Sequence, residues 1–360
     1  MTHTAASLQT LMARFNVTAR KEFGQHFVVD PEITRHMVTL SGVGCGDHVL
    51  EIGAGLGSLT LALAETGASV VAVEVDSKLA DALRYVIAGI TNAEDTSNIK
   101  TVTSIVDTED KGTAEVADNV GTAAKADVQV VEGDARTLDY SGLSVASDHW
   151  HMVSNLPYNI ATSLVIDLLS NVSVIKKMVV MLQRETAERL AAAPGSRARG
   201  IPSILIECYG KAQVLSRVPP EAFMPPPAVE SAVLLIERYN NSGENRNTTG
   251  ETQDATTHDR SSMIKVSQSD YELDTRQAED EVANKVVSTG CLHLQLDDRT
   301  MQCLKLLLRN AFGQRRKMLR RSLASLITSD DFEAAEVDPT ARPESLTFQQ
   351  WKNLATLKQH

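Results

Sequence analysis

The segment Asn155-Leu156-Pro157-Tyr158 has residue types and spacing suited to chemistry on an aromatic amine. The exocyclic amino group of adenine is a weak nucleophile because its lone pair is delocalised into the ring. The side-chain oxygen of Asn155 and the backbone carbonyl of Pro157 could each accept one N–H of that group, which favours a pyramidal nitrogen in the transition state. Tyr158 would stack on the base, which must first leave its own stack. The segment therefore predicts group transfer to adenine N6, with Asn155, Pro157 and Tyr158 as catalytic residues and without a metal.

A glycine-rich segment, Glu51-Ile52-Gly53-Ala54-Gly55-Leu56-Gly57, lies between a predicted strand and a predicted helix. Glycines there let the chain turn tightly and let a ligand approach backbone that a Cβ would block. The spacing is G-x-G-x-G, whereas a dinucleotide site has G-x-G-x-x-G. The spacing therefore favours S-adenosylmethionine as the cofactor, bound at Gly53 and Gly55.

Two acids follow the next predicted strands. Glu74 stands 21 positions after Gly53, where a carboxylate can accept hydrogen bonds from both ribose hydroxyls of a nucleoside. Asp134 follows the third strand, where a carboxylate can accept the adenine amino group of a cofactor. Taken singly, each acid can be a solvated strand end, and the glycines and the Pro-Tyr pair can be ordinary turns. Their occurrence after consecutive strands favours one shared site.

Parallel strands would bring these motifs to one edge of a sheet. Apolar runs typical of buried parallel strands occur at residues 48–52, 69–75, 128–131, 150–154 and 178–182, and helical patterns occur at 59–65, 78–87, 163–169 and 185–193. This alternation predicts an α/β fold with a doubly wound, Rossmann-like sheet of the class I methyltransferase type. We expect residues 203–215 and 231–237 to complete the sheet, and residues 300–326 to form helices of a small C-terminal domain.

The acidic net charge of −11 is unevenly distributed along the chain. Residues 91–127 carry a net charge of −5 and residues 240–298 a net charge of −7, so the rest of the chain is close to neutral. Residues 299–321 contain eight Lys or Arg and no acid. Arg315, Arg316 and Lys317 form the densest basic cluster and are predicted to bind RNA phosphates, although a solvated helix face is the alternative.

Composition also predicts how the chain divides. We expect a methyltransferase domain over residues 1–239 with an acidic insertion at 91–127, a polar acidic insertion or linker at 240–298, and a helical domain at 299–360. The four scattered cysteines, Cys45, Cys208, Cys291 and Cys303, indicate neither a disulfide framework nor a metal site. No apolar stretch of roughly 18 residues and no secretory leader pattern is present, so we expect a cytoplasmic protein that does not bind a membrane.

Several segments together resemble the small-subunit rRNA adenine dimethyltransferases of the KsgA/RsmA family. They are Gln25-His26-Phe27-Val28, the glycine-rich segment, Asn155-Leu156-Pro157-Tyr158-Asn159-Ile160 and Phe223-Met224-Pro225-Pro226-Pro227-Ala228-Val229-Glu230-Ser231-Ala232-Val233. The similarity covers residues 19–237 and resumes near Thr300, where Phe312-Gly313-Gln314-Arg315-Arg316-Lys317-Met318-Leu319 resembles the C-terminal signature of the family. Val28 replaces the usual Leu, and the two acidic insertions are not part of the family's core.

The resemblance implies an activity and a substrate. Such enzymes use S-adenosylmethionine to dimethylate two adjacent adenines in a hairpin loop near the 3′ end of small-subunit rRNA. We expect the present chain to act as a monomer on that rRNA within an immature small ribosomal subunit. The residues implied to contact the cofactor are His26, Val28, Gly53, Glu74, Asp134 and Asn155. Phe223 is implied to be the second aromatic side chain beside the target adenine.

Three other functions share parts of this pattern. Macrolide-resistance methyltransferases have the same chemistry but act on large-subunit rRNA, and Leu156 and the segment from Phe223 to Val233 favour the small-subunit enzyme. DNA adenine methyltransferases commonly carry Asp-Pro-Pro-Tyr and a separate recognition domain, and neither is found here. The third is a non-catalytic RNA-binding assembly factor that retains only the fold. Methyl transfer to rRNA, small subunits and duplex DNA would separate these functions.

Overall fold

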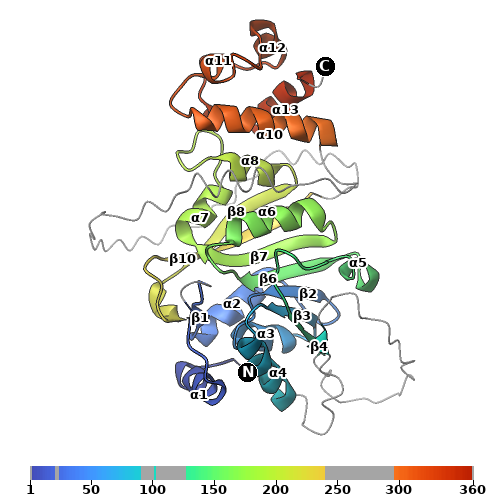
Figure 1. Ribbon diagram of the computed structural model, residues 1–360, viewed down its shortest axis with the longest axis vertical. Coiled ribbons are helices and arrows are strands. Elements are labelled where there is room, and N and C mark those ends of the chain that lie inside the picture. Colours follow the sequence, from blue (N-terminus) through green and yellow to red (C-terminus); the bar gives the residue numbers. More distant parts are fainter. Residues whose placement is uncertain (1, 21–23, 91–100, 103–126, 240–295, 359–360) are drawn as a thin grey trace, which may run out of the picture.

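The computed structural model describes residues 2–20, 24–90, 101–102, 127–239 and 296–358 (Figure 1). An eight-stranded sheet in the order β4-β5-β3-β2-β6-β7-β10-β8 lies at its centre. The strands are β2 (His48–Ile52), β3 (Ser69–Glu74), β4 (Thr101–Val102), β5 (Asp127–Glu132), β6 (Trp150–Asn155), β7 (Ile175–Gln183), β8 (Gly210–Val218) and β10 (Ser231–Arg238). Neighbours from β4 to β7 are parallel, and β10 is antiparallel to both β7 and β8. The predicted α/β sheet is confirmed.

The direction of chain progress through the sheet reverses at β2. The chain runs from β2 to β3 and then outward to β5 on one side, and it returns to β6 and β7 on the other side. In open α/β sheets this reversal leaves a crevice at the carboxyl ends of the adjoining strands. Gly53 follows β2 directly and Asn155 ends β6. The two motifs predicted to carry chemistry therefore meet at this crevice.

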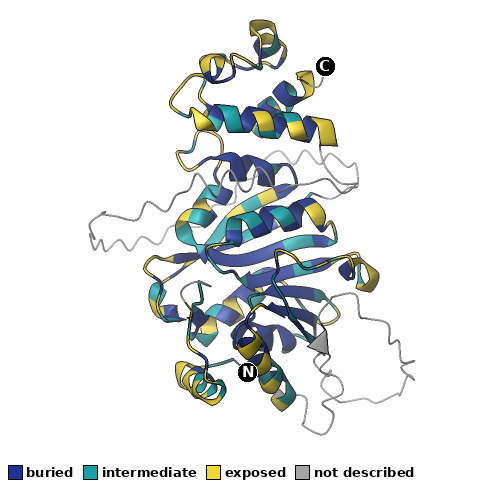
Figure 2. Cartoon of the chain, in the orientation of Figure 1, coloured by how far each residue is buried: buried dark blue, intermediate teal, exposed yellow. Residues whose placement is uncertain are grey.

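Helices cover both faces of the sheet, and most residues of β2, β3, β6 and β7 are buried, whereas most residues of the edge strand β8 are not (Figures 1 and 2). Val49 of β2 packs in a cluster with residues of α2, α3 and α4, whereas the next residue, Leu50, packs with residues of α6 and α8. This division follows from the alternation of side chains along a strand. The helices around the sheet are α1 (Ala5–Phe15), α2 (Pro31–Ser41), α3 (Ser58–Ala64), α4 (Ser77–Ile90), α5 (Leu143–Ala146), α6 (Ala161–Asn171), α7 (Arg184–Leu190) and α8 (Ile201–Glu207).

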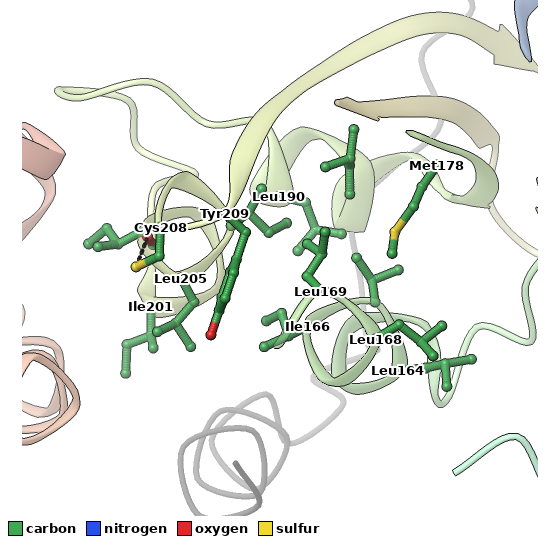
Figure 3. Packing of buried hydrophobic residues seen from close by; sticks show 14 of the residues in the cluster. Leu164, Ile166, Leu168, Leu169, Met178, Leu190, Ile201, Leu205, Cys208 and Tyr209 are labelled. Atoms are coloured by element: carbon green, nitrogen blue, oxygen red, sulfur yellow. Dashed lines mark hydrogen bonds between the residues drawn. The ribbon is translucent and has the colours of Figure 1, made fainter. Parts of the chain in front are cut away.

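Helix α8 corrects the prediction that residues 203–215 belong to the sheet. Only the second part of that segment lies in the sheet, because β8 begins at Gly210. Pro202 stands in the first turn of α8, where a missing N–H is tolerated, and the amide of Gly200 donates to the Ser203 hydroxyl at 3.1 Å. Figure 3 shows Leu205 of α8 and Leu169 of α6 in one packed cluster. A short apolar run buried on all sides does not distinguish a helix from a strand.

The C-terminal helices pack on α8 and on one another at one end of the molecule (Figure 1). They are α10 (Asp298–Gly313), α11 (Leu319–Ser322), α12 (Ser329–Ala334) and α13 (Phe348–Leu357), with a 3-10 turn, η4 (Pro343–Ser345). Asp297 caps α10 by accepting the Thr300 amide at 2.9 Å, and Leu296 before it is buried. The residues just before 299 are thus part of the helical fold. Among the described residues, no helix has the length and apolar character needed to cross a membrane.

The predicted acidic insertions fall mostly outside the described residues. Segments 91–100, 103–126 and 240–295 are not described, so the domain boundaries proposed from composition stay predictions. Within the first predicted insertion, residues 91–127, Thr101–Val102 forms β4, which pairs with Val130 and Val131 of β5. The first insertion therefore contributes an edge strand to the sheet in addition to its polar sequence.

A loop after α7 joins the C-terminal helices to the sheet domain. The Gly195 amide donates to the Glu344 carbonyl at 2.8 Å, and the Arg315 guanidinium donates to the Arg197 carbonyl at 2.6 Å. Arg199 in the same loop is fully buried and donates two hydrogen bonds to the Glu207 carboxylate, at 2.7 and 2.8 Å. A paired, planar contact of this kind fixes the loop against the end of α8.

We expect Arg199→Ala to lower the free energy of unfolding by about 3 kcal/mol, because it removes one partner of a largely buried ion pair. Urea denaturation monitored by circular dichroism would measure the change. Arg197→Ala is a matched control, since this side chain is exposed two positions away and its loss should cost less than about 0.5 kcal/mol. Equal stability of the two variants would show that the ion pair does not hold the loop.

Candidate active site

A pocket opens at the carboxyl ends of β2, β3, β5 and β6. It brings together every residue predicted to contact the cofactor and the predicted catalytic residues Pro157 and Tyr158. The predicted residues in its lining are His26, Val28, Gly53, Gly55, Glu74, Asp134, Asn155, Pro157 and Tyr158. The pocket therefore lies where the reversal in strand order places a ligand crevice.

The turn after β2 lies directly against the segment that follows β6. Gly53 has a φ of +74°, and a Cβ on it would lie 3.3 Å from Cδ of Pro157 and 3.4 Å from the Asn155 carbonyl. Gly57 has a φ of +87°, and its Cβ would lie 2.7 Å from a methyl group of Leu83. Only glycine meets both the backbone conformation and the space. The glycines thus bring the backbone of the turn within reach of a ligand beside Asn155.

The Glu74 carboxylate ties the end of β3 to the glycine turn. One oxygen accepts the Gly55 amide at 2.8 Å, and the other accepts the amides of Val75 and Asp76 at 3.0 Å each. Burial raises the pKa of Glu74, and the three amides oppose that rise. A carboxylate has about four lone-pair sites, so after three amides the oxygen that accepts Gly55 retains capacity for a further hydrogen bond. This geometry suits the predicted acceptor of ribose hydroxyls.

Asp134 follows β5, the strand that pairs with the strand carrying Glu74, and it also lines the pocket. Its carboxylate accepts three hydrogen bonds from the Arg136 guanidinium, the shortest of them at 2.6 Å, and one from the Arg136 amide at 2.9 Å. The ion pair is partly exposed to solvent. Asp134 is therefore oriented by Arg136, a residue that the sequence motif did not single out.

Asn155 and Tyr158 are held by hydrogen bonds that leave their functional groups turned to the pocket. The Asn155 side-chain nitrogen donates to the His26 carbonyl at 3.1 Å, which assigns the side-chain oxygen as a remaining acceptor. The Tyr158 hydroxyl and the Ser231 hydroxyl are 2.6 Å apart. Burial raises the pKa of Tyr158 further above its ordinary value, so the phenol is neutral at physiological pH. The Tyr158 ring also stacks on the His26 ring, with centroids 5.4 Å apart.

Residues 24–28 cover the pocket and are fastened by a two-stranded sheet. Strand β1 (Phe27–Val28) pairs with β9 (Phe223–Met224), which follows the 3-10 turn η3 (Pro220–Ala222). The His26 ring nitrogen Nδ1 lies 2.7 Å from the Pro225 carbonyl. Phe223 itself is 3% exposed, packs among aliphatic side chains and does not line the pocket. In this conformation Phe223 supports the cover, and the ring beside Tyr158 is that of His26, not the predicted second aromatic.

The predicted RNA-binding cluster lies in the turn between α10 and α11. Arg316 and Lys317 are exposed there. Arg315 differs from them, because its guanidinium donates to the Arg197 carbonyl and lies 3.5 Å from the Glu344 carboxylate. The structure thus separates a residue that joins the domains from two that face solvent.

Two pocket features escaped the prediction from sequence. Glu51 lines the pocket, but the prediction from the glycine-rich segment assigned a role only to its glycines. The Ser231 hydroxyl forms a hydrogen bond with the Tyr158 hydroxyl, and the position of Ser231 in the segment from Phe223 to Val233 did not predict that contact. An acid two positions before the first glycine was the available signal for Glu51. For Ser231 only the tertiary structure supplies the partner. No group of three or more potential metal ligands occurs in the part of the chain that the structure describes.

Comparison with known proteins identifies close sequence relatives. The sequence profile described as "Ribosomal RNA adenine dimethylase" matches residues 16–248. The "Ribosomal RNA small subunit methyltransferase A" of Bifidobacterium longum subsp. infantis is 33% identical over 354 residues, which cover 98% of this chain and 92% of the relative. The protein of the same name from Phenylobacterium zucineum is 33% identical over 341 residues, covering 95% of this chain and 88% of the relative.

Solved structures share the fold at lower identity. A dimethyladenosine transferase from Plasmodium falciparum superposes with a TM-score of 0.57 at 18% identity, over 91% of this chain and 96% of that one. The 23S rRNA methyltransferase ErmE superposes with a TM-score of 0.55 at 16% identity, over 93% of this chain and 100% of that one. These similarities establish the Rossmann-like methyltransferase fold.

Glu74→Gln should lower the affinity for S-adenosylmethionine roughly tenfold or more, because it removes a charged acceptor and points an amide N–H at backbone N–H groups. Isothermal titration calorimetry would measure the dissociation constant. Glu132→Gln is the matched control, since Glu132 is the register partner of Glu74 on β5 and does not line the pocket. Equal cofactor affinity in wild type and Glu74→Gln would remove Glu74 from the binding site.

Proposed function

The chain belongs to the ribosomal RNA adenine dimethylase family, and from that premise we propose that its substrate is the rRNA of the small ribosomal subunit. The enzyme transfers methyl groups from S-adenosylmethionine to the N6 amine of adenine in rRNA. The near full-length similarity to small-subunit methyltransferases supports the choice of subunit. The structural observation that supports methylation of an adenine amine is the orientation of the Asn155 amide, whose oxygen remains available as an acceptor.

The target in this proposal is two adjacent adenines in the hairpin loop near the 3′ end of that rRNA. Loop bases are recognised more readily than paired ones because they can turn out of the stack into a pocket. An immature small subunit in the cytoplasm would present such a loop, and a monomer suffices because the described chain supplies both walls of the pocket. These points extend the family assignment to a defined substrate.

Asn155 and Pro157 activate the target amine in the proposed mechanism. The Asn155 side-chain nitrogen is occupied by the His26 carbonyl, so the side-chain oxygen accepts one N–H of adenine N6. The Pro157 carbonyl already accepts the Ile160 amide at 3.2 Å and has a second lone pair for the other N–H. Both acceptors stabilise the positive charge that develops on N6 as it attacks the methyl group. The proton then leaves to solvent, without a metal.

Tyr158 provides the surface on which the base stacks. Its hydroxyl is fixed by Ser231, so the ring keeps its plane without a base present. The His26 ring covers one face of Tyr158, and the proposed position of adenine is the other face. Stacking on a prearranged ring lowers the entropy cost of placing the flipped base.

The pocket residues fit S-adenosylmethionine through the chemistry of their groups. When bound, this cofactor supplies an electrophilic methyl group on a positively charged sulfur. Glu74 retains acceptor capacity for ribose hydroxyls, and Asp134 can accept an amine from the adenine of the cofactor. Gly53 and Gly55 line the pocket, and a Cβ at these positions would approach Pro157 and the Phe27 ring to 3.3 Å.

Methylation of large-subunit rRNA is the second candidate, because ErmE shares the fold. Purified small subunits, protein-free small-subunit rRNA and protein-free large-subunit rRNA would be treated with labelled S-adenosylmethionine. The proposal expects dimethyladenosine only in small-subunit rRNA. Its formation in large-subunit rRNA alone would establish the second candidate, and no methylation of any RNA would indicate a non-catalytic assembly factor.

Asn155→Ala should lower the rate of methyl transfer by about a hundredfold, because it removes one acceptor that acts in the transition state. Mass spectrometry of treated rRNA would give the rate, and calorimetry would check that cofactor affinity is largely kept. Asn159→Ala is the matched control, since Asn159 lies in the same segment, is exposed and does not line the pocket. An undiminished rate in Asn155→Ala would exclude the proposed role.

RNA docking is proposed at Arg316 and Lys317, with Arg320 and Arg321 beside them. All four side chains are exposed. Each phosphate that they neutralise should contribute about −0.7 to −0.9 to the slope of log affinity against log salt. Arg316→Ala combined with Lys317→Ala should therefore flatten the slope by up to roughly two units, while cofactor affinity is unchanged. Filter binding of rRNA at several salt concentrations would measure it.

Arg315→Ala distinguishes a loss of RNA binding from a loss of contact between the C-terminal helices and the loop after α7. Because Arg315 binds the Arg197 carbonyl and Glu344, its loss should lower the melting temperature and change the salt slope less than the double variant does. A salt slope that is unaltered in the folded double variant would place RNA docking elsewhere on the molecule.

A further inference from the structure

Glu51, near the end of β2, is a buried carboxyl group without a counter-charge. Its side chain is 1% exposed and lines the cofactor pocket. In the described part of the chain, its Oε2 atom has no hydrogen-bond partner, and no ion pair includes this carboxyl. A buried polar atom is costly unless it is paired, so its retention in the pocket calls for a ligand or a proton.

The groups around Glu51 do not neutralise it. From β3, the Glu74 carboxylate adds a like charge, with its own oxygens bound to three amides. From α3, the hydroxyl and amide of Thr60 face Glu51 and favour its charged form, although neither Glu51 Oε2 nor Thr60 Oγ makes a hydrogen bond of normal geometry. The other titratable side chains of the lining are His26, Tyr158 and Asp134, and Asp134 is paired with Arg136 outside it. No Lys or Arg is among the described lining residues.

This environment determines the state of Glu51 before the cofactor binds. Removal of a carboxylate from water without a partner disfavours the charged form, and the neighbouring Glu74 acts in the same direction. Burial raises the pKa of Glu51 to about 8. At neutral pH the free protein therefore holds a proton on Glu51. The three amides that Glu74 accepts favour the charged form of that carboxyl against the effect of burial.

We propose that Glu51 loses its proton to solvent when S-adenosylmethionine enters the pocket, and takes a proton up again after methyl transfer. The donor carries a sulfonium, an ammonium and a carboxylate, so its net charge is +1, whereas the product S-adenosylhomocysteine has lost the sulfonium charge. A cation in the low-dielectric pocket favours the Glu51 carboxylate. Loss of that cation reverses the preference. Glu51 thereby discriminates the charged donor from the neutral product and assists product exchange. This inference rests on the use of S-adenosylmethionine by the family.

The proton balance contains no other step. On binding, the O–H bond of Glu51 breaks and the proton goes to the buffer, without a bond between Glu51 and the cofactor. During transfer, the carbon–sulfur bond breaks as the carbon–nitrogen bond to adenine forms, and the proton of adenine N6 leaves separately. Glu51 then accepts a proton from solvent as the product departs.

Calorimetry in two buffers of different ionisation enthalpy would count the protons released on binding. At pH 7, wild type should release close to one proton per S-adenosylmethionine, and distinctly fewer with S-adenosylhomocysteine. Glu51→Gln should release far fewer with either ligand, because the amide is isosteric with the protonated carboxyl and cannot ionise. Glu132→Gln, at the same edge of the sheet but outside the pocket lining, should behave as wild type.

The pH dependence of cofactor affinity gives a second measurement. Between about pH 6 and about pH 7.5, the dissociation constant of wild type should fall toward tenfold per pH unit, since binding favours the deprotonated form. The range stays below about pH 8, where the α-amino group of the cofactor itself titrates. The same series in Glu51→Gln should be much flatter, and the difference separates Glu51 from His26.

Equal proton release by wild type and Glu51→Gln would overturn the inference, and so would tight binding by wild type without proton release. Either result would leave the methyltransferase function intact, because S-adenosylmethionine would still bind. Absence of cofactor binding by folded wild type would instead contradict the function itself. If Glu51→Gln does not melt cooperatively, the two-buffer comparison of donor and product in wild type decides alone.

Discussion

The close approach of two backbone segments at one edge of the sheet is the constraint on which the site depends. The turn at Gly53 and the segment beginning at Asn155 follow adjacent parallel strands, and the Ile52 amide donates to the Ser154 hydroxyl at 2.9 Å between them. A side chain at Gly53 would meet Pro157 at 3.3 Å. Because the glycine keeps this contact short, the cofactor-binding turn and the acceptors for the target amine share one pocket. The strand order thus places the cofactor-binding turn beside the acceptors for the target amine.

Two buried glutamates in this pocket have different roles because their surroundings differ. Burial raises the pKa of Glu74, and the three backbone amides that it accepts favour its charged form. Glu51 lies beside it with an oxygen that has no partner among the described residues, and its pKa rises to about 8. A pair of acids in unequal environments is a common way for a protein to hold one charge and one proton. Here the pair faces a cofactor whose charge changes in the reaction.

Contacts outside the central sheet fix the residues that cover the pocket and also the C-terminal helices. The cover over it is secured by pairing of β1 with β9, so the Phe223 segment, distant in sequence, acts on the cofactor site through residues 24–28. At the other end of the molecule, Arg315 and Glu344 join the C-terminal helices to the loop after α7. The remaining exposed basic residues can then face RNA from a fixed position. An acidic chain can in this way keep a localised basic surface.

The sequence by itself determined the sheet and most of the pocket. Apolar runs located five of the six parallel strands from β2 to β7, all but β4, because a strand buried on both faces is apolar along most of its length. The strand ends then located Gly53, Glu74 and Asn155. Helix α8 was mistaken for a strand because a buried helix shows the same composition. The relation of Asp134 to the site could be predicted because parallel strands end at one edge.

Only the tertiary structure decided the contacts between segments that are distant in sequence. The family resemblance implied that Phe223 flanks the base, and the basic cluster predicted that Arg315 binds phosphate. In this structure Phe223 packs among aliphatic side chains and Arg315 contacts Arg197 and Glu344. In the same way, Glu51 was part of a recognised motif, but its proton depends on burial and on the neighbouring Glu74. Local pattern reports what a residue can do. Its charge state and its partners follow from the dielectric and the neighbours that the folded chain places around it.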